Sequence, residues 1–204
     1  MSADYQTGVI KLSHSSVKQY LTSGSIQSHY VKQIRDFSFN EEASHSVISQ
    51  ICLAYLLQFN TLEPPDINLD MFFPLAHYAA ENWITHANSS GKNKSQSSSL
   101  FTLMMKLFTD KNGAFENWVR ICDKDGFGMR HLQKKSNVIA KPLYYASVTG
   151  LTEVSCALLE MRVDVNAQGG EYGNALQAAS YGGHEGIAKL LIERGADVNS
   201  QGGE

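Results

Sequence analysis

The sequence predicts a mostly α-helical protein in which a helical module is followed by stacked helical hairpins, an α-solenoid. Two observations predict this fold class. The last third of the chain repeats itself at a shift of 33 residues, and a period of that length is typical of stacked units rather than of one globule. Ahead of the repeat, apolar residues recur at helical spacing between short polar stretches.

The N-terminal stretch predicts a short strand followed by a helix. Apolar and polar residues alternate over residues 8–12, which is the pattern of a strand. Residues 13–21 begin with a serine-rich segment and continue with helical spacing. We therefore expect a strand-to-helix transition near His14.

Four helices are predicted between residues 40 and 136. Asn40 and the two glutamates after it mark the start of the first helix, Pro64–Pro65 ends it, and Pro74 opens the second. The Ser-rich segment 88–99 is expected to be a flexible loop before the third. The residues expected to face inward are, helix by helix, Val47, Ile48, Ile51, Cys52, Tyr55 and Phe59; Leu75, Tyr78, Ala79 and Trp83; Leu100, Leu103, Met104, Leu107 and Phe108; and Phe115, Trp118, Val119 and Cys122.

Each C-terminal unit is predicted to form two short helices and an extended tip. Pro142–Ser147 aligns with Ala175–Ser180, and Asp164–Glu171 aligns with Asp197–Glu204. Gly195 supplies the left-handed residue that ends the outer helix of the second unit. One such unit cannot cover its own apolar face, so we expect the two units to stack.

The repeated segments resemble the ankyrin repeat. The resemblance is carried by Leu151–Asn166 and, more plainly, by His184–Asn199. It implies two ankyrin repeats, at about 141–173 and 174–204, and a protein-binding role rather than catalysis, because stacked repeats expose a ribbed concave surface.

The two units also depart from the ankyrin pattern. The usual Thr-Pro-Leu-His opening is replaced by Lys141–Tyr144 in the first unit and by Asn174–Gln177 in the second. Arg162 stands where the second unit has Gly195, and a bulky residue in a left-handed conformation costs about 1 kcal/mol or more. The first unit is therefore expected to be the less regular one.

Five residues are candidates for binding a protein partner. By resemblance, contacts in ankyrin proteins come from the tips and from the exposed side of the inner helices. Tyrosines suit this role because they are large and amphipathic and lose little rotamer entropy. The alternative is that these side chains only cover the core of the neighbouring repeat. The candidates are Tyr145, Val148, Glu171, Tyr172 and Tyr181.

A larger resemblance covers nearly the whole chain. Residues 12–21, 45–56 and 73–83 are similar to the region that joins the NACHT ATPase to the ankyrin array in NOD-like STAND proteins, above all those of filamentous fungi. The resemblance implies a module of a protein linked to non-self recognition or signalling. The implied domains are a winged-helix-like remnant over 1–39, a helical linker module over 40–136 and two ankyrin repeats over 137–204.

Nucleotide hydrolysis is not expected of this chain. A NACHT ATPase needs a loop of the form G-x-x-x-x-G-K-[S/T], whose backbone N–H groups and lysine hold the phosphates. The single Gly-Lys pair, Gly91–Lys92, is followed by Asn93, and His86 occupies the position of the first glycine. The sequence therefore predicts a protein that is not an enzyme and has no catalytic residues.

No metal or other cofactor is expected either. His77 and His86 are nine residues apart, and neither an H-E-x-x-H motif nor a paired Cys/His spacing occurs. The three cysteines include no C-x-x-C pair, so we expect reduced, buried thiols.

The charge distribution favours a protein partner. The formal net charge is −3, and residues 141–204 hold four Lys or Arg against eight Asp or Glu, so nucleic acid and acidic membrane surfaces are not expected partners. The longest apolar run, Ile51–Leu57, is too short to cross a bilayer. We expect a soluble, cytoplasmic protein. The alternative is a nucleic-acid-binding winged-helix regulatory protein, which would need a basic recognition helix.

The last predicted outer helix has no further repeat after it in this sequence, which ends at Glu204. About three repeats are generally needed for independent stability. Two hypotheses follow: the native protein is longer, or the uncapped C-terminal repeat finds cover in self-association.

Overall fold

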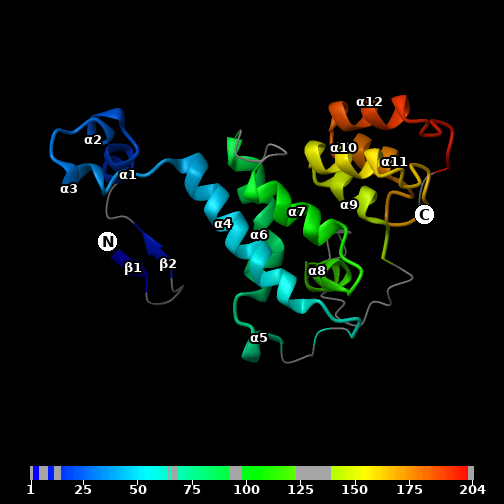
Figure 1. Cartoon of the computed structure of the whole chain (residues 1–204), viewed down its shortest axis with the longest axis horizontal. Coiled ribbons are helices and arrows are strands. Elements are labelled where there is room, and N and C mark those ends of the chain that lie inside the picture. The colour runs from blue at the N-terminus through cyan, green and yellow to red at the C-terminus, as the bar shows by residue number, and fades with distance from the viewer. Residues whose placement is uncertain are drawn as a thin grey trace.

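The computed structural model of the chain describes residues 2–4, 9–11, 15–63, 65, 69–91, 98–122 and 139–201. The described part is mostly helical, which confirms the predicted fold class. Figure 1 shows three groups of elements along the longest axis: a small N-terminal part, a central group of helices and the C-terminal hairpins. In chain order the elements are β1 (Ser2–Asp4), β2 (Val9–Lys11), α1 (Ser15–Leu21), α2 (Gly24–Gln27), α3 (Lys32–Arg35), α4 (Glu41–Leu56), the 3₁₀ helix η1 (Leu57–Phe59), α5 (Leu69–Phe72), α6 (Ala76–Ser89), α7 (Ser99–Phe108), α8 (Ala114–Cys122), α9 (Pro142–Val148), α10 (Thr152–Glu160), α11 (Ala175–Tyr181) and α12 (Glu185–Glu193).

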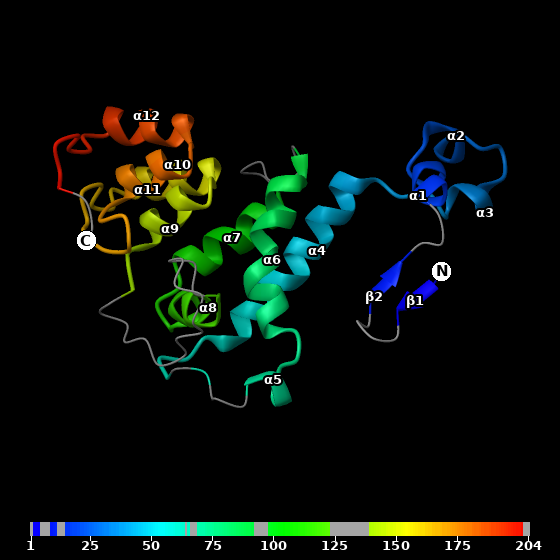
Figure 2. The same cartoon turned by 180° about the vertical axis from the view of Figure 1, so that it is seen from behind.

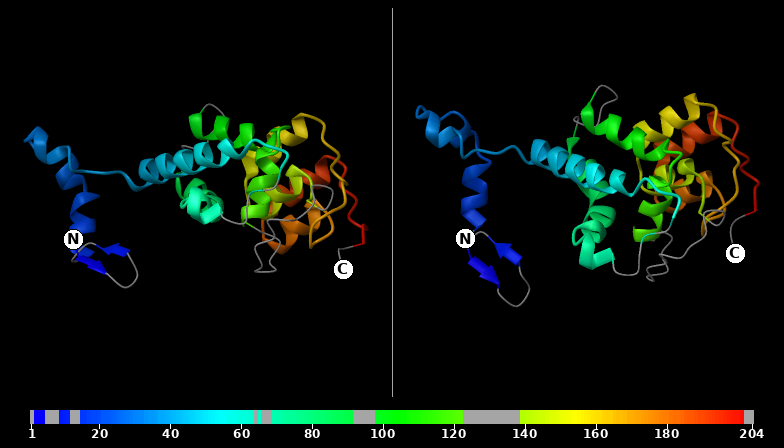
Figure 3. Two further views of the ribbon diagram at one scale, coloured as in Figure 1. Left: turned by 90° about the horizontal axis from the view of Figure 1, so that it is seen from below. Right: turned by 60° about the horizontal axis from the view of Figure 1, so that its bottom comes forward.

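The N-terminal part is a two-stranded hairpin followed by three short helices. Strands β1 and β2 are antiparallel, and α1 begins at Ser15. A strand within 8–12 and a helix within 13–21 therefore occur as predicted, while the transition near His14 lies outside the described residues. Figures 2 and 3 show this part at the end of the molecule opposite the hairpins. Its winged-helix-like character stays a prediction.

Aromatic rings form the centre of the helical group. The rings of Trp83 and Trp118 lie 5.5 Å apart at a steep angle, and Phe108 lies 5.6 Å from Trp118. The indole N–H of Trp118 donates to the Ala80 carbonyl at 3.1 Å, and the Ser49 hydroxyl donates to the Trp83 carbonyl at 2.9 Å. These bonds satisfy polar groups that α4, α6 and α8 bury between them.

The inward faces predicted for the first two helices are partly wrong. On α4, Val47 and Ile51 point to solvent, with 61% of Ile51 exposed, whereas Ser46 and Ser49 are buried. Small residues on this face let α6 pack closely, and spacing alone does not reveal which stripe a neighbouring helix covers. The exposed apolar side chains of α4 and α6 line a shallow groove of about 130 Å³; its lining residues are Ile48, Ile51, Cys52, Tyr55, Leu75, Tyr78 and Ala79.

The other two helices follow their predicted faces. On α7, Leu100, Met104, Leu107 and Phe108 are buried, and Leu103 packs against the core in part. On α8, Phe115, Trp118 and Val119 are buried, and Cys122 is half-buried.

Helix ends differ from the predictions in places. Asn40 caps α4 as predicted, because its side-chain oxygen accepts from the Ala43 N–H at 2.9 Å. Helix α6 begins at Ala76 rather than at Pro74. The loop expected over 88–99 is shorter, since α6 continues to Ser89 and Ser98 already caps α7 by accepting from the Phe101 N–H at 3.0 Å. The centre of that loop, residues 92–97, lies outside the described residues.

A buried polar pair fastens the chain after α4 to α8. The Asn117 amide donates to the carbonyls of Phe59 and Thr61, each at 2.8 Å. Arg120 is buried and donates to the Asn117 side-chain oxygen at 2.5 Å, and burial lowers the pKa of its guanidinium. This pair supplies hydrogen bonds where the turn after η1 cannot form a regular ladder.

The two C-terminal hairpins are built from helices of matching length. Helices α9 and α11 have seven residues each, and α10 and α12 have nine. The inner helices α9 and α11 pack against each other, and α10 packs against α12 (Figure 1). Asn166 joins the two tips, because its side chain donates to the Gly195 carbonyl at 3.1 Å and accepts from the Asp197 N–H at 2.8 Å. The predicted stacking of the two units is present.

Candidate protein-binding surface

The candidate surface is built on the tip between the hairpins and on the inner helix α11. Of the five residues predicted for it, Tyr145 does not belong there. It is 0% exposed, and its ring lies 5.6 Å from Phe115 and 6.0 Å from Trp118. The physical reason is that the first inner helix, α9, docks on the central helices, so its side chains become core. Tyr145 joins the two parts of the chain and is closed to a partner.

Val148 lies where the first repeat meets the second. Its side chain is half-buried and packs against the core. Its carbonyl oxygen lies 3.3 Å from Nε2 of His184, and because a carbonyl only accepts, the ring nitrogen is the donor. A Cβ on Gly150 or on Gly182 would lie 2.6 Å from this ring, so a larger residue at either position would displace the ring of His184. His184 is an inter-repeat residue that the sequence reading missed, because it stands outside the usual opening motif.

The tip, residues 169–173, is a tight loop that packs on the buried side chain of Tyr144. The Gly169 N–H donates to the Gly173 carbonyl at 2.8 Å, and the Tyr172 N–H donates to the Tyr144 hydroxyl at 3.3 Å. Gly170 has a φ of 77°, and a Cβ there would lie 2.2 Å from the Tyr144 ring. A residue with a side chain would be strained in this conformation, and its Cβ would collide with the ring. The backbone of the tip is therefore held in one shape.

Three tyrosine rings stack from the core to the surface. Tyr144 and Tyr172 lie 6.4 Å apart at 21°, and Tyr172 and Tyr181 lie 4.2 Å apart at 22°. Tyr144 is buried, Tyr172 is half-buried and Tyr181 is 73% exposed. Of the predicted candidates, Glu171 and Tyr172 lie in the tip and Tyr181 lies at the end of α11. The exposed ring of Tyr181 is the outer end of the stack.

Glu171 and Gln177 each hold a buried oxygen without a partner. Oε2 of Glu171 and Oε1 of Gln177 are shielded from solvent and accept no hydrogen bond. The amide of Gln177 is used on its other side, where it donates to the Ser200 carbonyl at 2.9 Å. Among the described residues, Glu171 takes part in no ion pair. Leaving a buried acceptor unpaired costs about 1–3 kcal/mol, more for a charged group, and because both oxygens are shielded from solvent, this cost falls on the folded tip itself.

A second polar cluster joins α4 to α6. The Nδ1 atoms of His45 and His86 lie 2.7 Å apart, and the Tyr78 hydroxyl lies 3.1 Å from Nε2 of His86. Desolvation, and then the charge of His45, lower the pKa of His86. The two histidines are far apart in sequence, so no local pattern could have indicated this contact.

The described residues offer little for other chemistry. No group of three or more His, Cys, Asp or Glu among them could hold a metal ion. None of the three cysteines, all of which lie in the described ranges, forms a disulfide, and the expectation that all are buried holds only for Cys52, whose thiol pKa is raised by burial. Within the described ranges, no helix has the length and apolar character needed to cross a membrane.

Comparisons with known proteins confirm part of these predictions. The ankyrin-repeat family matches residues 174–203, the stretch that contains α11 and α12. A protein of Monascus ruber named "Azaphilone pigments biosynthesis cluster protein L" is 35% identical to this chain over 197 residues. That match covers 86% of this chain but 38% of the relative, so the chain spans less than half of the relative's length. No solved structure matches this chain.

Proposed function

We propose that this chain is a non-catalytic protein-binding module that grips its partner through the tip 169–173 and the inner helix α11. One observation carries the proposal: an ankyrin hairpin presents the exposed Tyr181, whose ring stacks on Tyr172 of the preceding tip. Ankyrin repeats are protein-interaction modules, and rigid aromatic anchors with satisfied backbones make strong contacts at low entropic cost.

We further propose a setting for this module. It would serve a cytoplasmic, STAND-like signalling protein of a fungus, with the helices before the repeats linking an ATPase to the ankyrin array. The resemblance of residues 12–21, 45–56 and 73–83 supports this placement, and the relative from Monascus ruber is longer than this chain. The name of that relative concerns a biosynthesis cluster, so a test of function must also look for turnover.

Affinity capture followed by mapping tests the proposal. The full chain is used to capture proteins from a fungal extract, and a captured protein is then purified and mixed with it. Hydrogen exchange should slow over residues 169–181 in the complex, and the double variant Y172A/Y181A should bind at least about tenfold more weakly, the loss of one hot spot.

The matched control is Tyr30→Ala, which removes an equally large, exposed tyrosine from the N-terminal part. It should bind the captured protein like the wild type. Protection confined to residues 16–63, or ATP turnover by the purified chain, would contradict a non-catalytic ankyrin module.

A further inference from the structure

We infer that the surface of Glu171, Tyr172 and Tyr181 receives an arginine side chain from a basic segment of the partner protein. This inference rests on the proposed function and adds the chemistry of the contact. The guanidinium would lie flat on the outer face of Tyr181 and direct its N–H groups toward the carboxylate of Glu171.

The tyrosine stack is the first reason. Its rings are nearly parallel from Tyr144 through Tyr172 to Tyr181, and the series ends at a ring that is mostly exposed. A planar group can continue such a stack. The guanidinium of arginine is planar and weakly hydrated and stacks on aromatic faces, whereas the ammonium of lysine is a compact, strongly hydrated charge.

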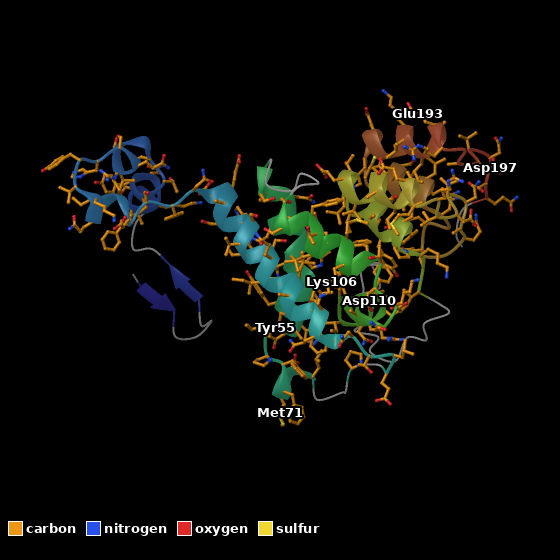
Figure 4. All side chains as sticks on the ribbon, viewed as in Figure 1. Tyr55, Met71, Lys106, Asp110, Glu193 and Asp197 are labelled. Carbon is orange, nitrogen blue, oxygen red and sulfur yellow. The ribbon has the colours of Figure 1, made fainter. Side chains whose placement is uncertain are left out.

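Charge is the second reason. Glu171 directly precedes Tyr172 in the chain and has neither a cation nor a donor for Oε2 among the described residues. Because Glu171 and Tyr172 are neighbours in the chain, the carboxylate of Glu171 favours a cation on the tyrosine pair, and 0.1 M salt screens such an attraction mainly beyond about 10 Å. The surrounding segment 141–204 is acidic, and Glu193 and Asp197 lie on its outer edge (Figure 4). A cationic guest is favoured over a neutral ring, and an anionic one is disfavoured.

Preorganisation is the third reason. The hydrogen bond from Tyr172 to the Tyr144 hydroxyl and the bond from Gly169 to Gly173 hold the tip before any partner arrives. Binding one side chain therefore orders little of this protein, which keeps the entropic cost low. Arginine also has a fork of donors that can reach a carboxylate while its plane stays on a ring.

Short peptides provide a direct test with the full chain. Ac-Gly-Arg-Gly-Arg-Gly-NH₂ is titrated into ¹⁵N-labelled protein near neutral pH, and the amide signals of residues 169–173 and 181 are followed. The same peptide with lysines in place of both arginines, and adenosine monophosphate as a planar anion, are the comparison probes. The arginine peptide should move these signals with an affinity about fivefold higher than the lysine peptide, the effect of about 1 kcal/mol of cation–π interaction.

Three variants separate the ring from the charge. Tyr181→Ala should abolish the shifts, whereas Tyr181→Phe, which keeps the ring, should retain them. Glu171→Gln should weaken arginine binding about threefold and reduce its dependence on salt, as expected when one favourable charge is lost. Tyr30→Ala is the control for removal of an exposed tyrosine and should leave the titration unchanged.

Several outcomes would overturn the inference. They are equal affinity for the lysine and arginine peptides, stronger shifts with adenosine monophosphate, or undiminished arginine binding by Tyr181→Ala. If these occur while a captured protein still protects residues 169–181, the arginine contact is wrong and the proposed function stands. If the arginine peptide binds as expected but captured proteins protect only the N-terminal part, the proposed function fails instead.

Discussion

Arg162 has a φ of 58° at the position where the second repeat has Gly195, whose φ is 90°. The left-handed conformation forced on an arginine was predicted from the alignment of the two units, and the structure confirms it. The carbonyl of Leu159 still receives its hydrogen bond from the Arg162 N–H at 3.1 Å, so the helix end is intact. The outer helix of the first repeat therefore ends with a strained backbone at Arg162.

Replacing Arg162 by glycine should stabilise the protein. Relief of left-handed strain is worth about 1–2 kcal/mol, and the added freedom of glycine in the unfolded chain offsets about 0.5–1 kcal/mol of this. We expect a net rise of about 0.5–1 kcal/mol in the free energy of unfolding, measured by urea denaturation. The mirror variant Gly195→Arg has space for its Cβ and should lower the free energy of unfolding, so a rise there would contradict the account.

His86 should make the protein less stable in mild acid. Because its pKa is lowered in the folded state, the folded chain binds fewer protons than the unfolded chain below about pH 6.5, the ordinary histidine value. The contribution of His86 to the free energy of unfolding should therefore be complete above that pH and should be lost as the pH falls from 6.5 through the folded pKa. His45 and Tyr78 contact His86 directly, whereas Glu41, which pairs with Lys18, interacts with His45 only through its charge.

Urea denaturation at a series of pH values between 7.5 and 5 measures this effect. In His86→Gln, the fall in stability over this interval should be smaller than in the wild type. Ile51→Ala, which removes an exposed side chain of α4 that carries no titratable group, is the control and should keep the wild-type slope. Equal slopes in His86→Gln and wild type would exclude the histidine pair as the cause.

At the scale of an element, α4 shows how far a hydrophobic pattern can be read. Its helical spacing and its Asn40 cap were predicted and are present. The buried face is nevertheless turned toward Ser46 and Ser49, which sit against α6, while Val47 and Ile51 face outward. The apolar stripe of α4 is wider than the surface that a neighbouring helix can cover. Packing therefore decides which part of the stripe is buried.

Two substitutions on α4 should differ sharply in their effect. Leu53 is fully buried, and Leu53→Ala should lower the free energy of unfolding by about 3 kcal/mol through lost burial and a cavity. Ile51→Ala removes an exposed side chain and should cost less than about 0.5 kcal/mol. Thermal or urea unfolding of both variants measures the difference, and a large cost for Ile51→Ala would mean that a partner or second copy covers this face.

At the scale of the whole molecule, the described residues cover the second hairpin less than they cover the first. Ile192 is 49% exposed, whereas Leu159, its counterpart 33 residues earlier, is 6% exposed on a helix, α10, that packs against α7, α9 and α12. Ser180 is likewise exposed and its counterpart Ser147 is buried. Equivalent positions are thus buried in the first hairpin and exposed in the second.

We expect this chain to self-associate through the open face at high concentration. Apolar area that stacking would bury favours association, and a C₂ pair would cover both faces at once. Light scattering over a concentration series should show the mass rising above 22.5 kDa, and Ile192→Lys should keep the chain monomeric. A wild-type chain that stays monomeric throughout would contradict this expectation.

Local spacing was sufficient for several features of this protein. The Asn40 cap and the spacing of the longer helices follow from residues close to one another in sequence, and the strained ending at Arg162 follows from aligning the two 33-residue units. Periodicity, capping and left-handed conformations are local properties of the backbone, so the chain alone determines them.

Contacts between distant segments were decided only by tertiary structure. Burial of Tyr145 against Trp118, the stacking of Tyr144 on Tyr172 and the pairing of His45 with His86 each require elements that meet only after packing. Whether a tyrosine becomes core or binding surface depends on what another element covers. That coverage is a property of three-dimensional arrangement and leaves no periodic trace in the residues themselves.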